Sequence, residues 1–162
     1  MLFAVVSDSH DAIPHLRRAV LLANERGASY LLHCGDLISP FMAWELGRFK
    51  GEVHVILGNN PGDVWLLAKH CAKLPHVHLH GQFTFEELSG VRVALVHFPE
   101  LAEGLALTGR FDLVCCGHTH VFETRRIGET VIINPGELLG KEGPPTMAFF
   151  DPETKEVEKV VL

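Results

Sequence analysis

The sequence lacks any stretch close to the roughly 20 uninterrupted apolar residues that a transmembrane helix requires, so we expect no membrane-spanning segment. It also lacks a basic segment at its start, where the apolar run Leu2–Val6 leads almost directly to Asp8. This pattern predicts a buried strand and not a signal peptide. We therefore expect a cytoplasmic protein.

Positive charge is in short supply: 14 Lys and Arg residues stand against 20 Asp and Glu residues, which gives a net charge of −6. The basic surface typical of nucleic-acid-binding proteins is therefore missing, and we expect no stable binding of nucleic acid. A phosphorylated substrate is still compatible with this charge, because bound metal ions can reverse the local field.

Cysteine is scarce as well, and its four copies form no CxxC pair: Cys34, Cys71, Cys115 and Cys116. Three of the four lie in apolar runs, so we expect reduced core residues without a disulfide or a zinc site. Histidine, in contrast, is frequent, with eleven copies in 162 residues. This excess indicates metal or acid–base chemistry, although it locates no site by itself.

No linker, repeat or low-complexity tract divides the chain, and 47% of its residues are apolar, so residues 1–162 are predicted to form a single domain. The predicted helices are Pro14–Gly27, Phe41–Phe49, Val64–Lys73 and Glu100–Leu107. The predicted strands are Leu2–Val6, Tyr30–His33, Val53–Leu57, Val77–Leu79, Phe83–Leu88, Val91–Val96, Phe111–Cys116, Phe122–Ile127, Thr130–Asn134, Thr146–Asp151 and Val157–Val161. This order predicts an α/β fold with two packed sheets or one large mixed sheet.

Side chains that bind metals follow five of these strands at the points where the strands end. They are Asp8, His10, Asp36, Asn59, His97, His118 and His120. In open α/β folds the sites form at the carboxyl ends of strands, so we expect these side chains to converge. Two carboxylates, one amide oxygen and four imidazoles are too many for one four-coordinate ion. They suit two first-row ions that share a bridging carboxylate.

Single members of this set have ordinary structural interpretations: Asp36 can cap a turn, and Asn59 can hold a loop. Their placement at five strand ends favours the metal interpretation. Two ions about 3.5–4 Å apart are the arrangement that hydrolases use for in-line attack on phosphorus. Such ions convert a bound water to hydroxide and neutralise the charge of the phosphoryl oxygens.

The same residues carry a family resemblance. The motifs resemble those of calcineurin-like metallophosphoesterases: Asp8-Ser9-His10, Gly35-Asp36, Gly58-Asn59, His97 and Gly117-His118-Thr119-His120. The chain is similar in size to the compact bacterial and archaeal phosphodiesterases, a branch that also includes the retromer subunit Vps29. The resemblance implies a four-layer sandwich of two packed mixed β-sheets flanked by helices. It also implies that Asp8, His10 and His120 hold one ion, that Asn59, His97 and His118 hold the other, and that Asp36 bridges them.

One departure from the family pattern bears on catalysis. Relatives carry His or Cys and then an acid after the Gly-Asn pair, whereas here Asn60 follows Asn59 and the next acid is Asp63. Asn60 cannot donate a proton near neutral pH; Asp63 is a candidate acid, and its alternative role is to cap the helix Val64–Lys73. General acid–base help contributes about 10²–10⁴-fold. We therefore expect a preference for good leaving groups, as in aryl phosphodiesters or phosphoanhydrides.

Three further features are open to two interpretations each. Phe98 replaces the usual Gly after His97, and its ring either shapes the substrate pocket or fills space under a loop. Glu137 replaces Ser in a turn that resembles the family's Asn-Pro-Gly-Ser, and we expect that turn to be structural. The alternating residues His76, His78 and His80 share one face of a strand, where a polar surface is favoured over a third ion.

We predict a metal-dependent hydrolase, a phosphodiesterase or phosphatase, that cleaves phosphodiester or phosphoanhydride bonds with a metal-bound hydroxide as nucleophile. The predicted catalytic residues are Asn59, His97 and Asp63. Manganese is the first choice for the two ions, with Ni, Fe, Zn and Co as alternatives. The expected partner is a small phosphate ester, nucleotide-like esters included, and the oligomeric state stays open. Two other functions remain: a catalytically weak scaffold of the same fold, which Asn60 favours, and a protein that binds a single metal ion.

Overall fold

Short apolar runs form the central strands of two β-sheets in the computed structural model, which describes all 162 residues. The first sheet has the order β11 (Glu156–Val161), β10 (Thr146–Asp151), β1 (Phe3–Val6), β2 (Tyr30–His33), β3 (Glu52–Val55) and β4 (Val77–Leu79). The second has the order β5 (Thr84–Leu88), β6 (Val91–Leu95), β7 (Leu113–Cys115), β9 (Thr130–Pro135) and β8 (Phe122–Ile127). Each sheet combines parallel and antiparallel pairs, so both are mixed.

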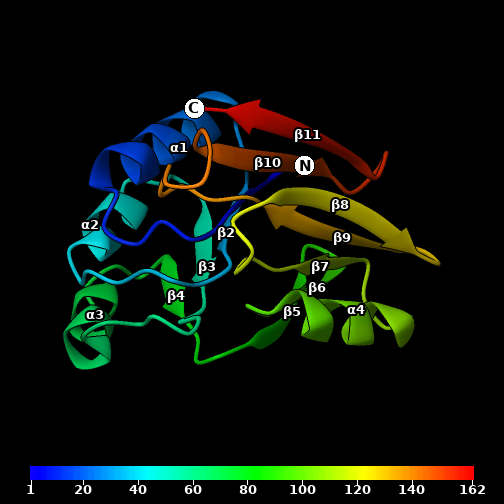
Figure 1. Cartoon of the computed structure of the whole chain (residues 1–162), viewed down its shortest axis with the longest axis horizontal. Helices are drawn as coiled ribbons and strands as arrows, with labels where there is room; N and C mark the ends of the chain where they lie inside the picture. The colour runs from blue at the N-terminus through cyan, green and yellow to red at the C-terminus, as the bar shows by residue number, and fades with distance from the viewer.

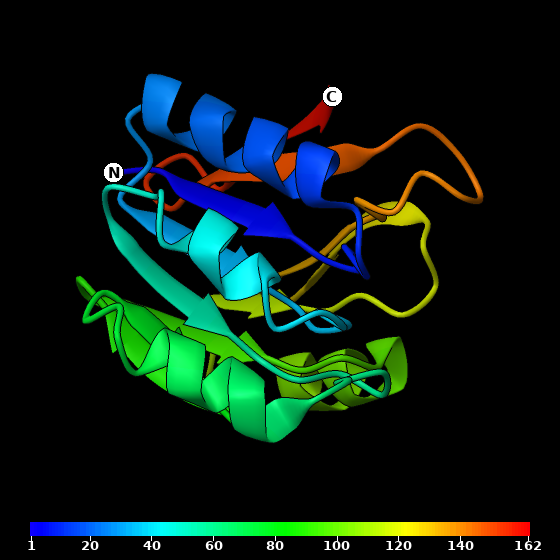
Figure 2. The same cartoon turned by 90° about the vertical axis from the view of Figure 1, so that its left-hand side faces the viewer.

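Helices cover the outer faces of the two sheets (Figure 1). The helices α1 (Ile13–Glu25), α2 (Met42–Leu46) and α3 (Val64–Cys71) pack on the first sheet, and Figure 2 shows them in a row in front of it. The helix α4 (Pro99–Leu107) packs on the second sheet. None of the helices has the length and apolar composition needed to cross a membrane.

Three apolar layers hold these four layers of structure together. The largest layer lies between α1, α2, α3 and the first sheet, the next between the two sheets, and the smallest between the second sheet and α4. Helix α1 illustrates the cause: Pro14 favours its first turn, and its buried residues Leu16, Ala19, Val20 and Ala23 recur every three or four positions. One face of the helix is therefore apolar and packs on the sheet.

The predicted four-layer sandwich is confirmed, and every predicted strand and helix forms. The ends of the elements shift by at most three residues, as at α2, which spans Met42–Leu46 instead of Phe41–Phe49. The sequence left open whether the strands form two packed sheets or one large mixed sheet, and the structure has two sheets. The four cysteines are free and buried, as expected.

Candidate metal centre

The loops after β1, β2, β6 and β7 bring most of the predicted ligands into two overlapping groups. In the first group, Asp8, His10 and His120 each offer one ligand atom within 4.8 Å of the others. In the second, Asp8, Asp36 and His97 do the same. The carboxylate of Asp36, a member of the second group, also faces the first, because its Oδ2 is 3.7 Å from His10 Nε2 while its Oδ1 is 3.4 Å from His97 Nε2. Strand ends far apart in sequence thus meet, as the sequence predicts.

The two remaining predicted ligands, His118 and Asn59, lie at the exposed rim of the same site. His118 Nδ1 and Asn59 Oδ1 are 3.0 Å apart, and the His118 ring centroid is 5.2 Å from that of His97. The backbone N–H of His118 also donates to Asp8 Oδ2 at 3.0 Å. All seven predicted residues are therefore brought to one place.

The backbone of this site is strained in a way that marks it off from the rest of the chain. Seven non-glycine residues have a positive φ, and five of them are candidate ligands: Asp8, His10, Asp36, His118 and His120. Such conformations cost about 1–3 kcal/mol each and persist only where the surroundings fix them. Their concentration here indicates that the loops are shaped to aim these side chains.

Two glycines allow the loops to approach one another closely. A Cβ atom at Gly117 would overlap Ser7 Oγ and Asp8 Oδ2, and one at Gly58 would overlap Asp36 Oδ1 and its backbone N. Gly58 also has a φ of +74°, which residues with a Cβ rarely adopt. The Gly-His and Gly-Asn pairs of the motifs are thus explained by the space that Asp8 and Asp36 occupy.

Hydrogen bonds fix how two of the imidazoles face the site. His97 Nδ1 donates to the carbonyl oxygen of Cys34 at 2.8 Å, and His120 Nδ1 donates to Glu137 Oε2 at 2.6 Å. In a neutral imidazole with a proton on Nδ1, the other nitrogen, Nε2, presents a lone pair. Both rings therefore present Nε2 as a metal ligand.

The buried atoms of the site fit a bound cation. Asp8 Oδ1, His10 Nε2 and His97 Nε2 are buried and have no hydrogen-bond partner. A buried polar atom without a partner costs about 1–3 kcal/mol, so native structures rarely leave one. Three such atoms in one place, all of types that bind divalent ions, are satisfied together when a metal binds between them.

The two carboxylates of the centre differ in their surroundings. Burial raises the pKa of Asp8. Burial also acts to raise the pKa of Asp36, but hydrogen bonds from Asn60 and the nearby His97 outweigh it and hold the pKa below its usual value. Asp36 is therefore ionised near neutral pH, the state in which a carboxylate can coordinate a metal ion.

Glu137 contacts a candidate ligand, His120, and this contact was not expected from the sequence. The turn was expected to be structural, and its role in the fold is visible where Glu137 Oε1 accepts the N–H groups of Glu142 and Gly143 at 2.6 and 3.1 Å. Its other oxygen holds His120, and the side chain is 1% exposed. Burial acts to raise the pKa of Glu137, but these hydrogen bonds lower it overall, so the group is ionised. The feature of the sequence that could have pointed to this contact is the acid Glu137 in place of the Ser of the family's turn.

His33 is a second positioning residue beneath the centre. Its Nδ1 accepts the backbone N–H of Gly35 at 3.2 Å, and its Nε2 lies 2.9 Å from Ser9 Oγ. The ring thereby links the loop of Asp8 and His10 to the loop of Asp36. Complete burial lowers the pKa of His33 to about 3, so the imidazole is neutral.

Asn60, which stands where relatives carry His or Cys, and Asp63, the next acid along the chain, make different contacts. Asn60 donates its backbone N–H to Asp36 Oδ1 at 2.9 Å and its side-chain N–H to Asp36 Oδ2 at 2.7 Å. Asp63 caps α3, because its carboxylate accepts the N–H of Leu66 at 2.9 Å. The helix-cap interpretation of Asp63 is therefore confirmed, while its use as a general acid stays a prediction.

Phe98 lies at the rim, beside two of the candidate ligands. Its ring centroid is 4.7 Å from that of His118 and 5.3 Å from that of His97, with both rings edge-on to it. The ring is half-buried. It therefore forms one wall of the site, and its contact with a substrate base stays a prediction.

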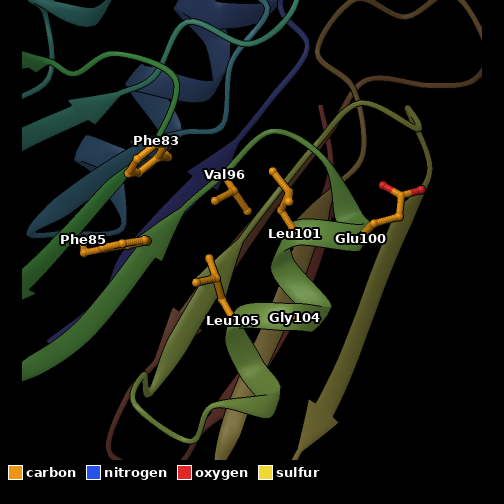
Figure 3. A pocket seen from close by; sticks show the side chains of 7 residues that line it. All are labelled: Phe83, Phe85, Val96, Glu100, Leu101, Gly104 and Leu105. Carbon is orange, nitrogen blue, oxygen red and sulfur yellow. The ribbon is translucent and has the colours of Figure 1, made fainter.

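The largest cavity of the molecule lies elsewhere. It has a volume of about 340 Å³ and is lined mainly by the apolar residues Phe83, Phe85, Val96, Leu101 and Leu105. Figure 3 shows the side chains of β5 and α4 facing one another across it. None of the candidate ligands contributes to this cavity, so it is separate from the metal centre.

Comparison of the sequence with known proteins shows which family the chain matches. The family described as "Calcineurin-like phosphoesterase superfamily domain" matches residues 1–155. Phosphodiesterase MJ0936 of Methanocaldococcus jannaschii is 28% identical, covering 100% of this chain and 99% of the relative. A probable metallophosphoesterase of Methanothermobacter thermautotrophicus is 30% identical over 84% of this chain and 76% of its own length.

Solved structures agree with these sequence matches. A structurally and functionally characterised archaeal phosphodiesterase superposes with a TM-score of 0.92 at 28% identity and covers 100% of both chains. Vps29 of Entamoeba histolytica, solved in complex with zinc, superposes with a TM-score of 0.67 at 18% identity over 99% of both chains. The second likeness shows the fold alone.

Proposed function

Because residues 1–155 make the chain a member of the calcineurin-like phosphoesterase superfamily, hydrolases of phosphate esters, we propose that it is a phosphodiesterase that uses two divalent ions. The observation that carries this proposal is the set of buried, partnerless ligand atoms of Asp8, His10 and His97. The fold brings these atoms together at the strand ends that carry the family motifs.

The proposed ligand sets follow from geometry and family resemblance together. Asp8, His10 and His120 would hold one ion, as their mutual approach within 4.8 Å supports. Asn59, His97 and His118 would hold the other, and Asp36 would contact both. The contacts of Asp36 support its placement between the two positions, because Oδ2 faces His10 Nε2 and Oδ1 faces His97 Nε2. Oxygen and nitrogen ligands without thiolate suit first-row divalent ions. Mn²⁺ is our first choice, with Ni²⁺, Fe²⁺, Zn²⁺ and Co²⁺ as alternatives.

When bound, two such ions lower the pKa of a water molecule and neutralise the charge of phosphoryl oxygens. The chain's own contribution is to orient the ligands. Cys34 O and Glu137 lock the His97 and His120 rings with Nε2 facing the centre, and the negative charge of Glu137 makes His120 a stronger ligand. His118 and Asn59 lie at the exposed rim, where they would also be near the phosphate oxygens of a bound substrate.

Protonation of the leaving group is the weak point of this site. Asn60 has no titratable proton and is bound to Asp36. Asp63, the predicted acid, is bound to the N-terminus of α3. We therefore propose that the substrates are phosphodiesters or phosphoanhydrides whose leaving groups depart without a strong acid, among them aryl and nucleotide-like esters.

An assay with bis-p-nitrophenyl phosphate and added Mn²⁺ tests the function. We expect wild-type protein to hydrolyse the ester, Asp36→Asn to lose at least about 10²-fold in kcat/KM, and the surface variant Asp11→Asn to match wild type. Metal analysis should find two ions per chain at the centre. Two bound ions with no turnover of any ester in a broad panel would favour the scaffold. A single bound ion at saturation would favour a mononuclear protein.

A further inference from the structure

A second group of metal-type side chains lies at one edge of the sandwich, outside the centre described above. It consists of His54 on β3, His80 directly after β4, and Glu86 on β5, and we call these three residues the edge cluster. One ligand atom from each lies within 4.8 Å of the others. His54 Nδ1 is 3.1 Å from His80 Nε2, and His80 Nδ1 is 3.6 Å from Glu86 Oε1.

The register of the strands explains why these side chains meet. His54 lies between Val53 and Val55, which are buried in the layer under the helices, so its side chain points to the other face of the sheet. That face packs against the second sheet. The first sheet ends at β4 and the second at β5, which are consecutive along the chain. Imidazoles and a carboxylate thus occupy the edge of the space between the sheets, where apolar residues stand elsewhere.

The spacing of the nitrogen atoms suits a tetrahedral ion. With Zn–N bonds of about 2.0–2.1 Å, two imidazole nitrogens on one zinc stand about 3.3 Å apart. The His54 and His80 nitrogens are 3.1 Å apart, and their rings are nearly parallel, with an interplanar angle of 9°. A hydrogen bond also accounts for this pair alone. Glu86 Oε1, brought in from the other sheet, lies beside the opposite ring nitrogen of His80, Nδ1, and also accepts the hydroxyl of Thr84. One donor atom of each of the three residues still lies within 4.8 Å of the others, so Glu86 adds a third donor that a hydrogen-bonded pair of imidazoles does not need.

Burial keeps the two imidazoles of the edge cluster in the neutral form that can bind a cation. His54 is 7% exposed, and burial together with the neighbouring His80 and His78 lowers its pKa to about 4. Burial also lowers the pKa of His80. Both imidazoles are therefore neutral near pH 7 and need not release a proton to bind a metal.

We propose that the edge cluster binds one Zn²⁺-type divalent ion, which links the first sheet to the second at the β4–β5 edge. Two imidazoles and one carboxylate form a set that zinc accepts, with the fourth position left to water. The ion binds the folded chain only, because the ligands come from both sheets. Zinc bound here therefore stabilises the fold.

Zinc stoichiometry measured by equilibrium dialysis and elemental analysis tests this site. We expect His80→Gln and Glu86→Gln each to bind one zinc fewer per chain than wild type. His76→Gln and Glu87→Gln, neighbours outside the cluster, should keep the wild-type number. The difference of one equivalent should persist in an Asp36→Asn background, so it does not depend on what the metal centre holds.

A second measurement covers the case in which a variant folds poorly. The circular dichroism spectrum checks the fold of each variant, and Glu86→Gln changes the charge with little change in shape. Zinc should raise the Tm of Asp36→Asn more than that of Asp36→Asn combined with Glu86→Gln. Equal stoichiometry in wild type and either cluster variant, or an equal rise in Tm, would overturn the proposal.

Discussion

The metal centre and the edge cluster use the same side-chain types in opposite backbone settings. At the centre, five candidate ligands have a left-handed backbone, and three buried ligand atoms have no partner. In the edge cluster, His54 and Glu86 lie in regular strands, and His54 and His80 are partners of each other. The centre stores strain that a bound ion offsets, whereas the edge cluster is relaxed without one. Small changes in shape should therefore damage the centre far more than the edge.

Gly117→Ala should break the centre most completely. A Cβ atom there would overlap Ser7 Oγ and Asp8 Oδ2, so the loops after β1 and β7 must separate. We expect weaker metal binding at the centre and a loss of esterase activity of more than about 10²-fold, because an ångström-scale displacement in an active site costs about this much in rate. Isothermal titration with Mn²⁺ measures the first and the diester assay the second.

Gly104→Ala is the matched control for this change. Gly104 lies within α4, and a Cβ atom there would meet nothing within 4 Å. Replacing a helical glycine by alanine stabilises a protein by about 0.5–1 kcal/mol. Unchanged metal binding in Gly117→Ala would show that the loops are not fixed by close approach.

Glu137→Gln should weaken the centre without breaking it. Glutamine keeps the shape of the side chain and can still contact His120, but it removes the negative charge that holds the ring's Nδ1 proton. Loss of such an outer partner lowers metal affinity by about 10–100-fold. Mn²⁺ titration measures the change. Glu142→Gln, whose backbone N–H alone contacts Glu137, should retain wild-type affinity, and equal affinity in both variants would mean that Glu137 serves the turn only.

The pH dependence of stability should reveal the buried imidazole under the centre. The pKa of His33 is about 3 in the folded chain and about 6.5 when unfolded, so between these values only the unfolded state takes up the proton. The contribution of His33 is thus fully present above pH 6.5 and is lost as the pH falls. Between pH 7 and pH 5 this loss amounts to about 2 kcal/mol.

Urea unfolding of metal-free wild type and His33→Asn at several pH values measures this effect. The variant is less stable at pH 7, since its contacts with Ser9 and Gly35 change, but its stability should fall less between pH 7 and pH 5. Parallel losses in the two proteins would show that His33 does not stay neutral on folding.

The strands, the helices and the meeting of the seven candidate ligands could be predicted because each follows from local sequence pattern. Apolar periodicity locates the elements, and parallel strands bring their carboxyl ends to one edge, which places Asp8 beside Asp36. The family resemblance was needed to divide the candidate ligands between the two proposed ions. Neither the sequence pattern nor the family resemblance depends on the details of side-chain packing.

Contacts between distant segments could not be predicted in this way. Glu137 reaches His120 only because the turn after β9 folds back under the loop after β7. Glu86 meets His54 and His80 only through the packing of one sheet edge on the other, whereas His54 and His80 are neighbours because β3 pairs with β4. The sequence pattern placed His76, His78 and His80 on one face, but it had no means of showing that His54 lies beside them.

Glu52→Gln should have the smallest effect of these substitutions. It tests whether the ion pair beside the edge cluster matters for zinc binding or for stability. Glu52 Oε2 lies 2.6 Å from His78 Nε2, and both side chains are about half exposed, at 51% and 42%. Exposed ion pairs contribute about 0–1 kcal/mol, and this pair lies outside the edge cluster. We expect unchanged zinc stoichiometry and a change in the free energy of unfolding at the lower end of that range, measured in urea at pH 7. The His78 ring stacks on the His54 ring, with their centroids 4.9 Å apart. If Glu52→Gln instead bound one zinc fewer, the position of the His78 ring would control zinc binding, and His78 and Glu52 would belong to the site.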